Sequence, residues 1–156
     1  MKAKLFISAC ALVILAACTK DQFTTAPQLT FTSVSTQTVA VDQLIVFTLE
    51  YTDREGDIQD SLFIQKQRID ICNTGGVTDS GFAVYYPMPS DVPTQKSAKG
   101  EIQVKFLHAS GNPNYPDIGD PRCPGNDTCI FKFVLHDKAG NKSDTAYSPQ
   151  IVVIKR

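Results

Sequence analysis

The sequence predicts an all-β domain, and three observations carry that prediction. Short segments alternate apolar and polar side chains, which is the period-two pattern of a strand with one buried face. No helical periodicity continues beyond a turn or two. The 9 Gly and 9 Pro, with many Asn and Asp, fall mostly between these segments, as turns require. At 156 residues, the chain supports one domain with its own hydrophobic core.

The first four strands are predicted over residues 29–36, 43–52, 61–71 and 81–86. The first contains Thr, Phe and Val, which favour strands. The second alternates, and its buried face is predicted to consist of Ile45, Phe47, Leu49 and Tyr51. The third has apolar residues from Leu62 onward. The fourth ends before Pro87, because proline cannot donate a hydrogen bond to a ladder.

The last three strands are predicted over residues 100–108, 129–136 and 144–154. The fifth strand alternates most cleanly, with Ile102, Val104 and Phe106 inward. Seven short strands with hairpin-length loops are typical of a seven-stranded Greek-key immunoglobulin/fibronectin-like β-sandwich. A barrel is the alternative. We expect Phe47, Phe106 and Phe133 in the core.

A long irregular segment separates the fifth predicted strand from the sixth. Residues 109–128 contain four prolines and no periodic pattern. A loop of this length in a compact domain is usually functional or mobile. The segment is therefore a candidate for contact with a partner.

The N-terminus has the layout of a secretory signal peptide. Lys2 and Lys4 precede an apolar run over residues 5–15, which is too short to span a membrane. The run ends in L-A-A-C, which resembles the lipobox of bacterial lipoprotein precursors. That resemblance implies cleavage before Cys18, a diacylglyceryl group on its thiol and an acyl chain such as palmitate on its new amine. An ordinary secretory signal or an uncleaved anchor is the alternative.

These features divide the chain into a lipoprotein signal peptide at 1–17, a lipidated tether at 18–28 and an Ig-like β-sandwich domain at 29–156. In lipoproteins that the lipobox resembles, an aspartate directly after the lipidated cysteine is a signal for retention in the inner membrane, and Thr19 stands at that position here. The resemblance therefore implies attachment to the outer membrane, with the domain periplasmic or surface-exposed. Removal of the signal peptide takes away two lysines and changes the formal net charge from −1 to −3. Neither value favours nucleic acid as a partner.

Three motifs carry a family resemblance. They are T-D-R-E-G-D-I at 52–58, A-K-G-E-I-Q-V at 98–104 and D-K-A-G-N-K-S at 137–143. Together with the lipobox, they resemble the uncharacterised small lipoproteins of Bacteroidota, and the last two are similar to motifs of Ig-like and cadherin-like modules. The resemblance implies a fold and a compartment, and it implies no activity.

Two predicted loops carry most of the acidic residues. In the sandwich topology, the loop after the second strand and the loop after the sixth share one end of the domain. The residues brought together would be Asp53, Glu55, Asp57, Asp137 and Asn141. Such oxygen ligands suit Ca²⁺, and we expect no other cofactor. The alternative is that these residues are solvated turn formers, because Asp, Asn and Gly dominate turns for backbone reasons.

Besides Cys18, the mature chain retains Cys72, Cys123 and Cys129. Outside the cytoplasm a disulfide is permitted, and three cysteines can form at most one. The turn sequence between Cys123 and Cys129 makes them the expected pair. A bond between Cys72 and Cys129 is the alternative, because the strands that carry them are neighbours in this topology.

The sequence does not favour an enzyme, since it contains no nucleophile elbow, H-E-x-x-H motif or phosphate loop. We expect an accessory or binding module for a protein or a glycan, with Tyr85, Tyr86 and Tyr115 available for stacking. The alternatives are a small secreted enzyme and a Ca²⁺-dependent adhesion-like module. A polar constellation in one concave pocket would favour the enzyme, and an apolar or aromatic patch would favour the binder.

Overall fold

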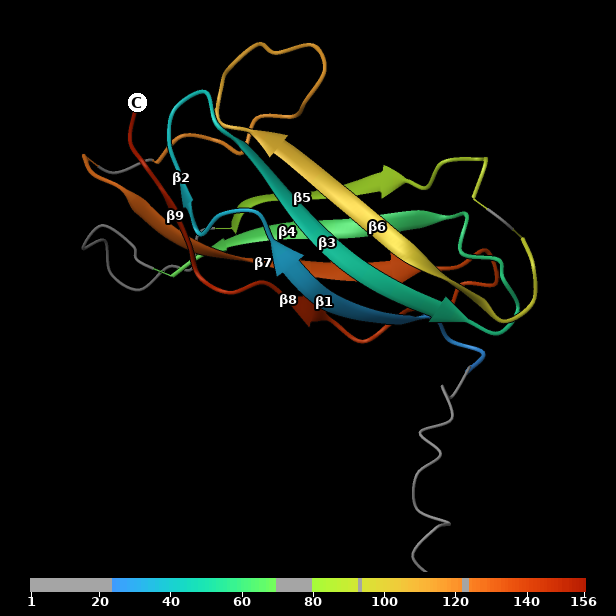
Figure 1. Cartoon of the computed structure of the whole chain (residues 1–156). Helices are drawn as coiled ribbons and strands as arrows, with labels where there is room; N and C mark the ends of the chain where they lie inside the picture. The colour runs from blue at the N-terminus through green and yellow to red at the C-terminus, as the bar shows by residue number, and fades with distance from the viewer. Residues whose placement is uncertain (1–23, 70–79, 93, 122–123) are drawn as a thin grey trace, which may run out of the picture.

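The computed structural model describes residues 24–69, 80–92, 94–121 and 124–156, and these residues form two packed β-sheets without a helix (Figure 1). The first sheet has three strands in the order β1 (Gln28–Val34), β3 (Leu44–Asp53) and β6 (Ala98–Leu107). The second has the order β2 (Thr38–Val39), β9 (Ile151–Val153), β7 (Asp127–His136), β4 (Ser61–Arg68) and β5 (Ser80–Pro87), with β8 (Ala146–Tyr147) also paired to β7. The predicted all-β sandwich is therefore observed.

The strand count differs from the prediction, because the described residues contain nine strands instead of seven. The predicted last strand is divided into β8 and β9 by Ser148 and Pro149. Pro149 has no N–H, and the Ser148 hydroxyl accepts the N–H of Phe131 at 2.9 Å in place of a backbone partner. The extra strand β2 has only two residues and runs parallel to β9, so no local sequence pattern predicts it.

The core lies between β3 and β6 on one side and β4 and β7 on the other. β3 and β6 pair without interruption from Leu44 opposite Leu107 to Asp53 opposite Ala98. Inward residues of β3 therefore stay in phase over the whole strand. Phe47, at its centre, lies 4.6 Å from Phe131 between ring centroids. The predicted core residues Phe47, Phe106 and Phe133 are all buried, so that prediction is confirmed.

One side of the sandwich is formed by two sheet edges. β5 pairs with β4 and joins the second sheet, so β6 has a strand neighbour only on its β3 side among the described residues. Across the gap, the Phe82 and Phe106 ring centroids are 5.4 Å apart. Farther along, inward side chains of both edges, such as Val84 and Ile102, are only partly buried. The two edges thus face each other without closing completely.

The loops gather at the two ends as the sandwich topology predicts. Ser97 donates its N–H to the Arg54 carbonyl at 2.8 Å, and Lys138 donates its N–H to the Asp57 carbonyl at 2.9 Å, so the β3–β4, β5–β6 and β7–β8 loops share one end. The described chain also begins there, since Thr24 accepts the N–H of Arg54 at 3.3 Å.

No helix among the described residues is long and apolar enough to cross a membrane.

The proline-rich loop after β6 packs against the other end. Leu107 donates its N–H to Pro116 and accepts that of Ile118, both at 3.0 Å, and the Ile118 side chain is fully buried. The described part of this loop is therefore a cover for the core, which the absence of periodicity in its sequence did not indicate.

Candidate functional site

Three of the five predicted calcium ligands lie together. Asp53, Asp57 and Asp137 each offer a carboxylate oxygen, and these oxygens all lie within 4.8 Å of one another. Glu55 is exposed and does not belong to the group. Asn141 supports the group, because its N–H and side-chain amide donate to the two oxygens of Asp137 at 2.7 and 2.8 Å.

Asp53 is held at the end of β3 by the turn that follows. Its Oδ2 accepts the backbone N–H groups of Gly56 at 2.5 Å and Asp57 at 3.1 Å. Gly56 has φ +73°, and a Cβ there would meet the Gln95 carbonyl oxygen at 2.0 Å, so the turn requires glycine. Although Asp53 is 0% exposed, its Oδ1 has no hydrogen-bond partner.

The ionisation of Asp57 is affected by its position close to the two other carboxylates. Burial raises the pKa of its carboxyl above the usual value, and the negative charges of Asp137 and Asp53 raise it further. Its Oδ1 is also buried without a partner. Among the described residues, no lysine or arginine forms an ion pair with any of the three carboxylates.

A cavity of about 690 Å³ lies between the two sheet edges. Most of its wall is apolar, with contributions from Leu62, Ile64, Tyr86, Met88, Val92, Ile102, Val104 and Phe106. Tyr51 lines it as well. Burial raises the pKa of the phenols of Tyr51 and Tyr86, and the negative charge of Asp53 raises the pKa of Tyr51 further. Exposed Lys99, Glu101 and Lys105 of β6 lie along its margin.

The two histidines lie outside this cavity. The ring of His136 packs edge-on against Tyr85, with centroids 5.6 Å apart. His108 is fully buried at the end covered by the proline-rich loop, where its Nε2 lies 3.4 Å from Asp120 Oδ1. His108 Nδ1 has no partner.

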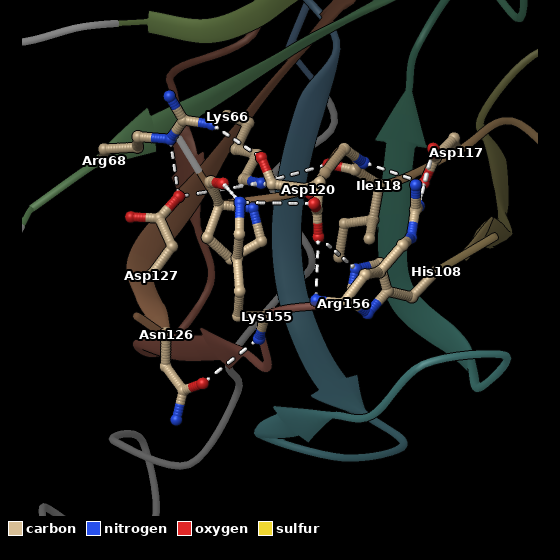
Figure 2. Close-up of polar contacts among 12 residues, drawn as sticks. Lys66, Arg68, His108, Asp117, Ile118, Asp120, Asn126, Asp127, Lys155 and Arg156 are labelled. Atoms are coloured by element: carbon tan, nitrogen blue, oxygen red, sulfur yellow. Dashed lines mark hydrogen bonds and ion pairs between the residues drawn. The ribbon is translucent and has the colours of Figure 1, made fainter. Parts of the chain in front are cut away.

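A buried ionic cluster, shown in Figure 2, occupies that end. Arg68 Nε donates to Asp127 Oδ2 at 2.5 Å, and Lys66 Nζ lies 4.0 Å from the same oxygen. Lys66, which is 1% exposed, also donates to the carbonyls of Ile118 and Gly119 at 3.0 and 3.3 Å. Burial lowers the pKa of the Lys66 amine. The cluster therefore fastens the proline-rich loop to β4.

The C-terminus extends this network (Figure 2). Arg156 donates to both carboxylate oxygens of Asp117 at 2.7 Å. Lys155 Nζ lies 3.3 Å from Asp120 Oδ2 and donates to the Pro121 carbonyl. Burial alone would raise the pKa of Asp120, but hydrogen bonds from Arg156, Lys155 and His108 bring that pKa below its usual value. These contacts make a clamp between the loop and the chain end.

Sequence reasoning missed the buried cluster, although a signal was present. Lys66 and Arg68 follow Leu62 and Ile64 at period two, so the strand pattern alone places both on the inward face. Charged residues are rarely fully buried unless they are paired, and that rule favours a solvent-facing interpretation. Their partner Asp127 is 59 residues from Arg68 in sequence, so no local pattern identifies it.

Of the predicted cysteine sites, only Cys129 lies among the described residues, where it carries a free thiol. The thiol is buried and donates to the Ile151 carbonyl at 3.5 Å, and burial raises its pKa to about 11. The lipidation site Cys18, the expected partner Cys123 and the alternative partner Cys72 lie outside the described residues. The predicted pairing therefore stays a prediction.

No family model and no curated protein matches the chain. The solved structures to which the chain is similar include the sporulation control protein Spo0M from Bacillus subtilis, with a TM-score of 0.48 and 10% identity. They also include a beta-glucosidase from Listeria innocua in complex with gluconolactone, at 0.40 and 9%, and a Niemann-Pick type C2 protein from the Japanese carpenter ant, at 0.38 and 8%. The matches cover 84%, 81% and 86% of this chain, and 50%, 16% and 98% of those chains. These similarities indicate nothing about what this chain binds.

Proposed function

We propose that the protein is a membrane-anchored cell-envelope lipoprotein whose domain acts as a binding module without catalysis, and that it holds an apolar small molecule between β5 and β6. The observation that carries this proposal is the cavity of about 690 Å³ with its mostly apolar wall. Small-molecule sites typically have volumes of about 300 to 1,000 Å³ and are lined mainly by apolar side chains.

The packing of the two edges supports an apolar occupant. Ile102 and Val104 of β6 and Met88 after β5 pack against the core but remain only partly buried. Transfer of such surface out of water is favourable by about 25 cal/mol per Å². A ligand that enters the cavity would complete their burial, whereas exposed Lys99 and Lys105 at the margin are available to contact a polar end group.

A glycan is a less suitable occupant than the sequence suggested. Tyr85 and Tyr86 are adjacent on β5 and therefore face opposite sides of the sheet. Tyr85 is 60% exposed and packs against Phe63 on the outer face, with centroids 4.8 Å apart, whereas Tyr86 lines the cavity. Tyr85 is therefore not available to a glycan in the cavity, and Tyr86 and Tyr115 are the two tyrosines of the predicted set that line it.

The strand order supports the finer topology that we propose, an immunoglobulin/fibronectin-like Greek key. The chain passes from β3 in the first sheet to the β4–β5 hairpin in the second, returns to β6 beside β3, and crosses again to β7 beside β4. Because β5 pairs with β4 in the second sheet, the edge of β6 that faces away from β3 has no strand neighbour among the described residues. That edge is one wall of the cavity.

The Ile102→Trp variant should test the cavity as the binding site. The indole would occupy the space between β5 and β6, so we expect the affinity for a fluorescent naphthalene sulfonate dye, and for a long-chain fatty acid that displaces it, to fall at least tenfold. Fluorescence titration measures both. The matched control is Glu50→Trp, which adds the same group to the exposed side of β3.

Equal binding by the wild type, Ile102→Trp and Glu50→Trp would contradict the proposal, since the dye would then bind elsewhere. Circular dichroism of each variant should retain the strand signal, so that loss of binding is separated from loss of the fold.

The proposed anchor is tested at Cys18. Mass spectrometry of protein extracted from membranes should find an N-terminal peptide that begins at Cys18 and carries the diacylglyceryl group. Two acyl chains suffice for stable anchoring, because each buried CH₂ contributes about 0.8 kcal/mol. The Cys18→Ser variant should leave the membrane fraction. An unmodified Cys18 in membrane-extracted protein would refute the lipoprotein assignment.

A further inference from the structure

We propose that Asp53, Asp57 and Asp137 form a Ca²⁺ site that joins the β3–β4 and β7–β8 loops at the end of the domain where the described chain begins. This inference is independent of the cavity. It rests on the convergence of the three carboxylates and on oxygen atoms that have no protein partner.

The first argument is the unpartnered oxygen of Asp53. The Asp53 side chain is fully buried, and its Oδ2 accepts two backbone N–H groups. Its Oδ1 has no hydrogen-bond partner, and Asp57 Oδ1 has none either. A buried polar atom without a partner is costly, and a charged one more so. The Asp53 carboxylate belongs to a group of oxygens within 4.8 Å of one another, so one cation among them could satisfy several at once.

The second argument is ligand chemistry. Ca²⁺ takes oxygen ligands at 2.3 to 2.6 Å, so oxygens on opposite sides of the ion lie about 5 Å apart. The observed limit of 4.8 Å agrees with that span. No histidine or cysteine belongs to the group among the described residues, which favours a hard cation over zinc. Mg²⁺ is less suitable, because it requires shorter distances and strict octahedral geometry.

The third argument is charge and preorganisation. Three carboxylates lie together without an ion pair to a basic residue among the described ones, and the Lys138 amine instead donates to Gln59 Oε1 at 2.8 Å. The backbone N–H groups of the turn hold Asp53, and Asn141 holds Asp137. Two of the three carboxylates, those of Asp53 and Asp137, are therefore oriented before any ion binds. No ion pair to a basic side chain among the described residues offsets the repulsion between the three.

The experiment compares the protein, extracted in detergent, in about 2 mM CaCl₂, in about 2 mM MgCl₂ and in chelator. These ion concentrations exceed the Kd of about 0.1 to 1 mM at which extracellular modules bind Ca²⁺. We expect a higher melting temperature in CaCl₂ than in chelator, a smaller increase in MgCl₂, and one Ca²⁺ per chain by calorimetric titration. Identical melts in CaCl₂ and chelator, without titration heat, would overturn the proposal.

Two variants and a control separate a metal site from a structural cluster. Asp57→Asn should weaken Ca²⁺ at least tenfold and yet raise the melting temperature in chelator, because it removes one of the repelling charges. Asp137→Asn should also weaken Ca²⁺ at least tenfold. The matched control Asp60→Asn, an exposed aspartate of the same loop, should leave Ca²⁺ affinity unchanged. An equal loss in Asp60→Asn would show that Ca²⁺ binds only to general negative charge.

Discussion

Replacement of Asp127 by Ala is expected to lower the free energy of unfolding by about 3 to 5 kcal/mol, which is the usual cost of removing one partner of a buried ion pair. Asp127 accepts the Nε–H of Arg68 at 2.5 Å and lies 4.0 Å from the Lys66 amine, and both cations are buried. Without the carboxylate, two positive charges would remain in the interior. Urea denaturation followed by circular dichroism measures the loss.

The loss should depend on pH in a definite direction. The pKa of Lys66 is lowered in the folded protein, so the unfolded chain binds more protons and stability rises with pH as the folded lysine loses its proton. Removal of Asp127 takes away a charge that favours protonated Lys66, which lowers that pKa further. The deficit of the Asp127→Ala variant should therefore be largest near neutral pH and shrink in alkaline solution.

Two comparisons make this result specific. Asp144→Ala removes an exposed aspartate and should change the free energy of unfolding by no more than about 0.5 kcal/mol. Lys66→Met in the Asp127→Ala background should recover part of the loss, because an apolar side chain of similar length replaces an unpaired charge. A deficit below about 1 kcal/mol in Asp127→Ala, at neutral pH, would contradict the role of the cluster as a buried clamp.

Phe47→Ala is expected to destabilise the domain by about 3 to 5 kcal/mol, as large-to-small changes of buried aromatics do. Its ring lies within 4.6 Å of Phe131, 5.5 Å of Phe133 and 6.4 Å of Phe106 between centroids, so one side chain connects both sheets. The substitution would leave an empty space where the Phe47 ring was, bounded by other aromatic rings that cannot move in to fill it. Denaturant unfolding should show a lower midpoint with an unchanged slope.

The control for this prediction is Phe63→Ala. Phe63 is only partly buried on the outer face of β4, where it packs against Tyr85 with centroids 4.8 Å apart. We expect a loss of about 1 kcal/mol, the range of a single aromatic pair. Equal losses at Phe47 and Phe63 would mean that the interface between the sheets is not the principal core.

Part of the candidate site could be predicted from sequence. The positions of Asp53 and Asp57 in a turn after a strand, and of Asp137 after another, follow from local patterns together with the topology rule that places these loops at one end. The sequence could not show that Glu55 lies outside the carboxylate group of Asp53, Asp57 and Asp137, because the turn around Gly56 determines where each side chain points. The buried state of Asp53 likewise depends on loops that are distant in sequence.

What the sequence determined by itself is the period of each strand. Alternation in β3, β6 and β7 establishes which residues share a face, since successive strand side chains point to opposite sides. Only the tertiary structure decided which faces are covered, because that depends on elements far away in the chain. Because β5 pairs with β4, a cavity is left beside β6. Ile118 and Asp127 pack over the end of β4 and bury Lys66 and Arg68. From their charges alone, both residues would be predicted to face solvent.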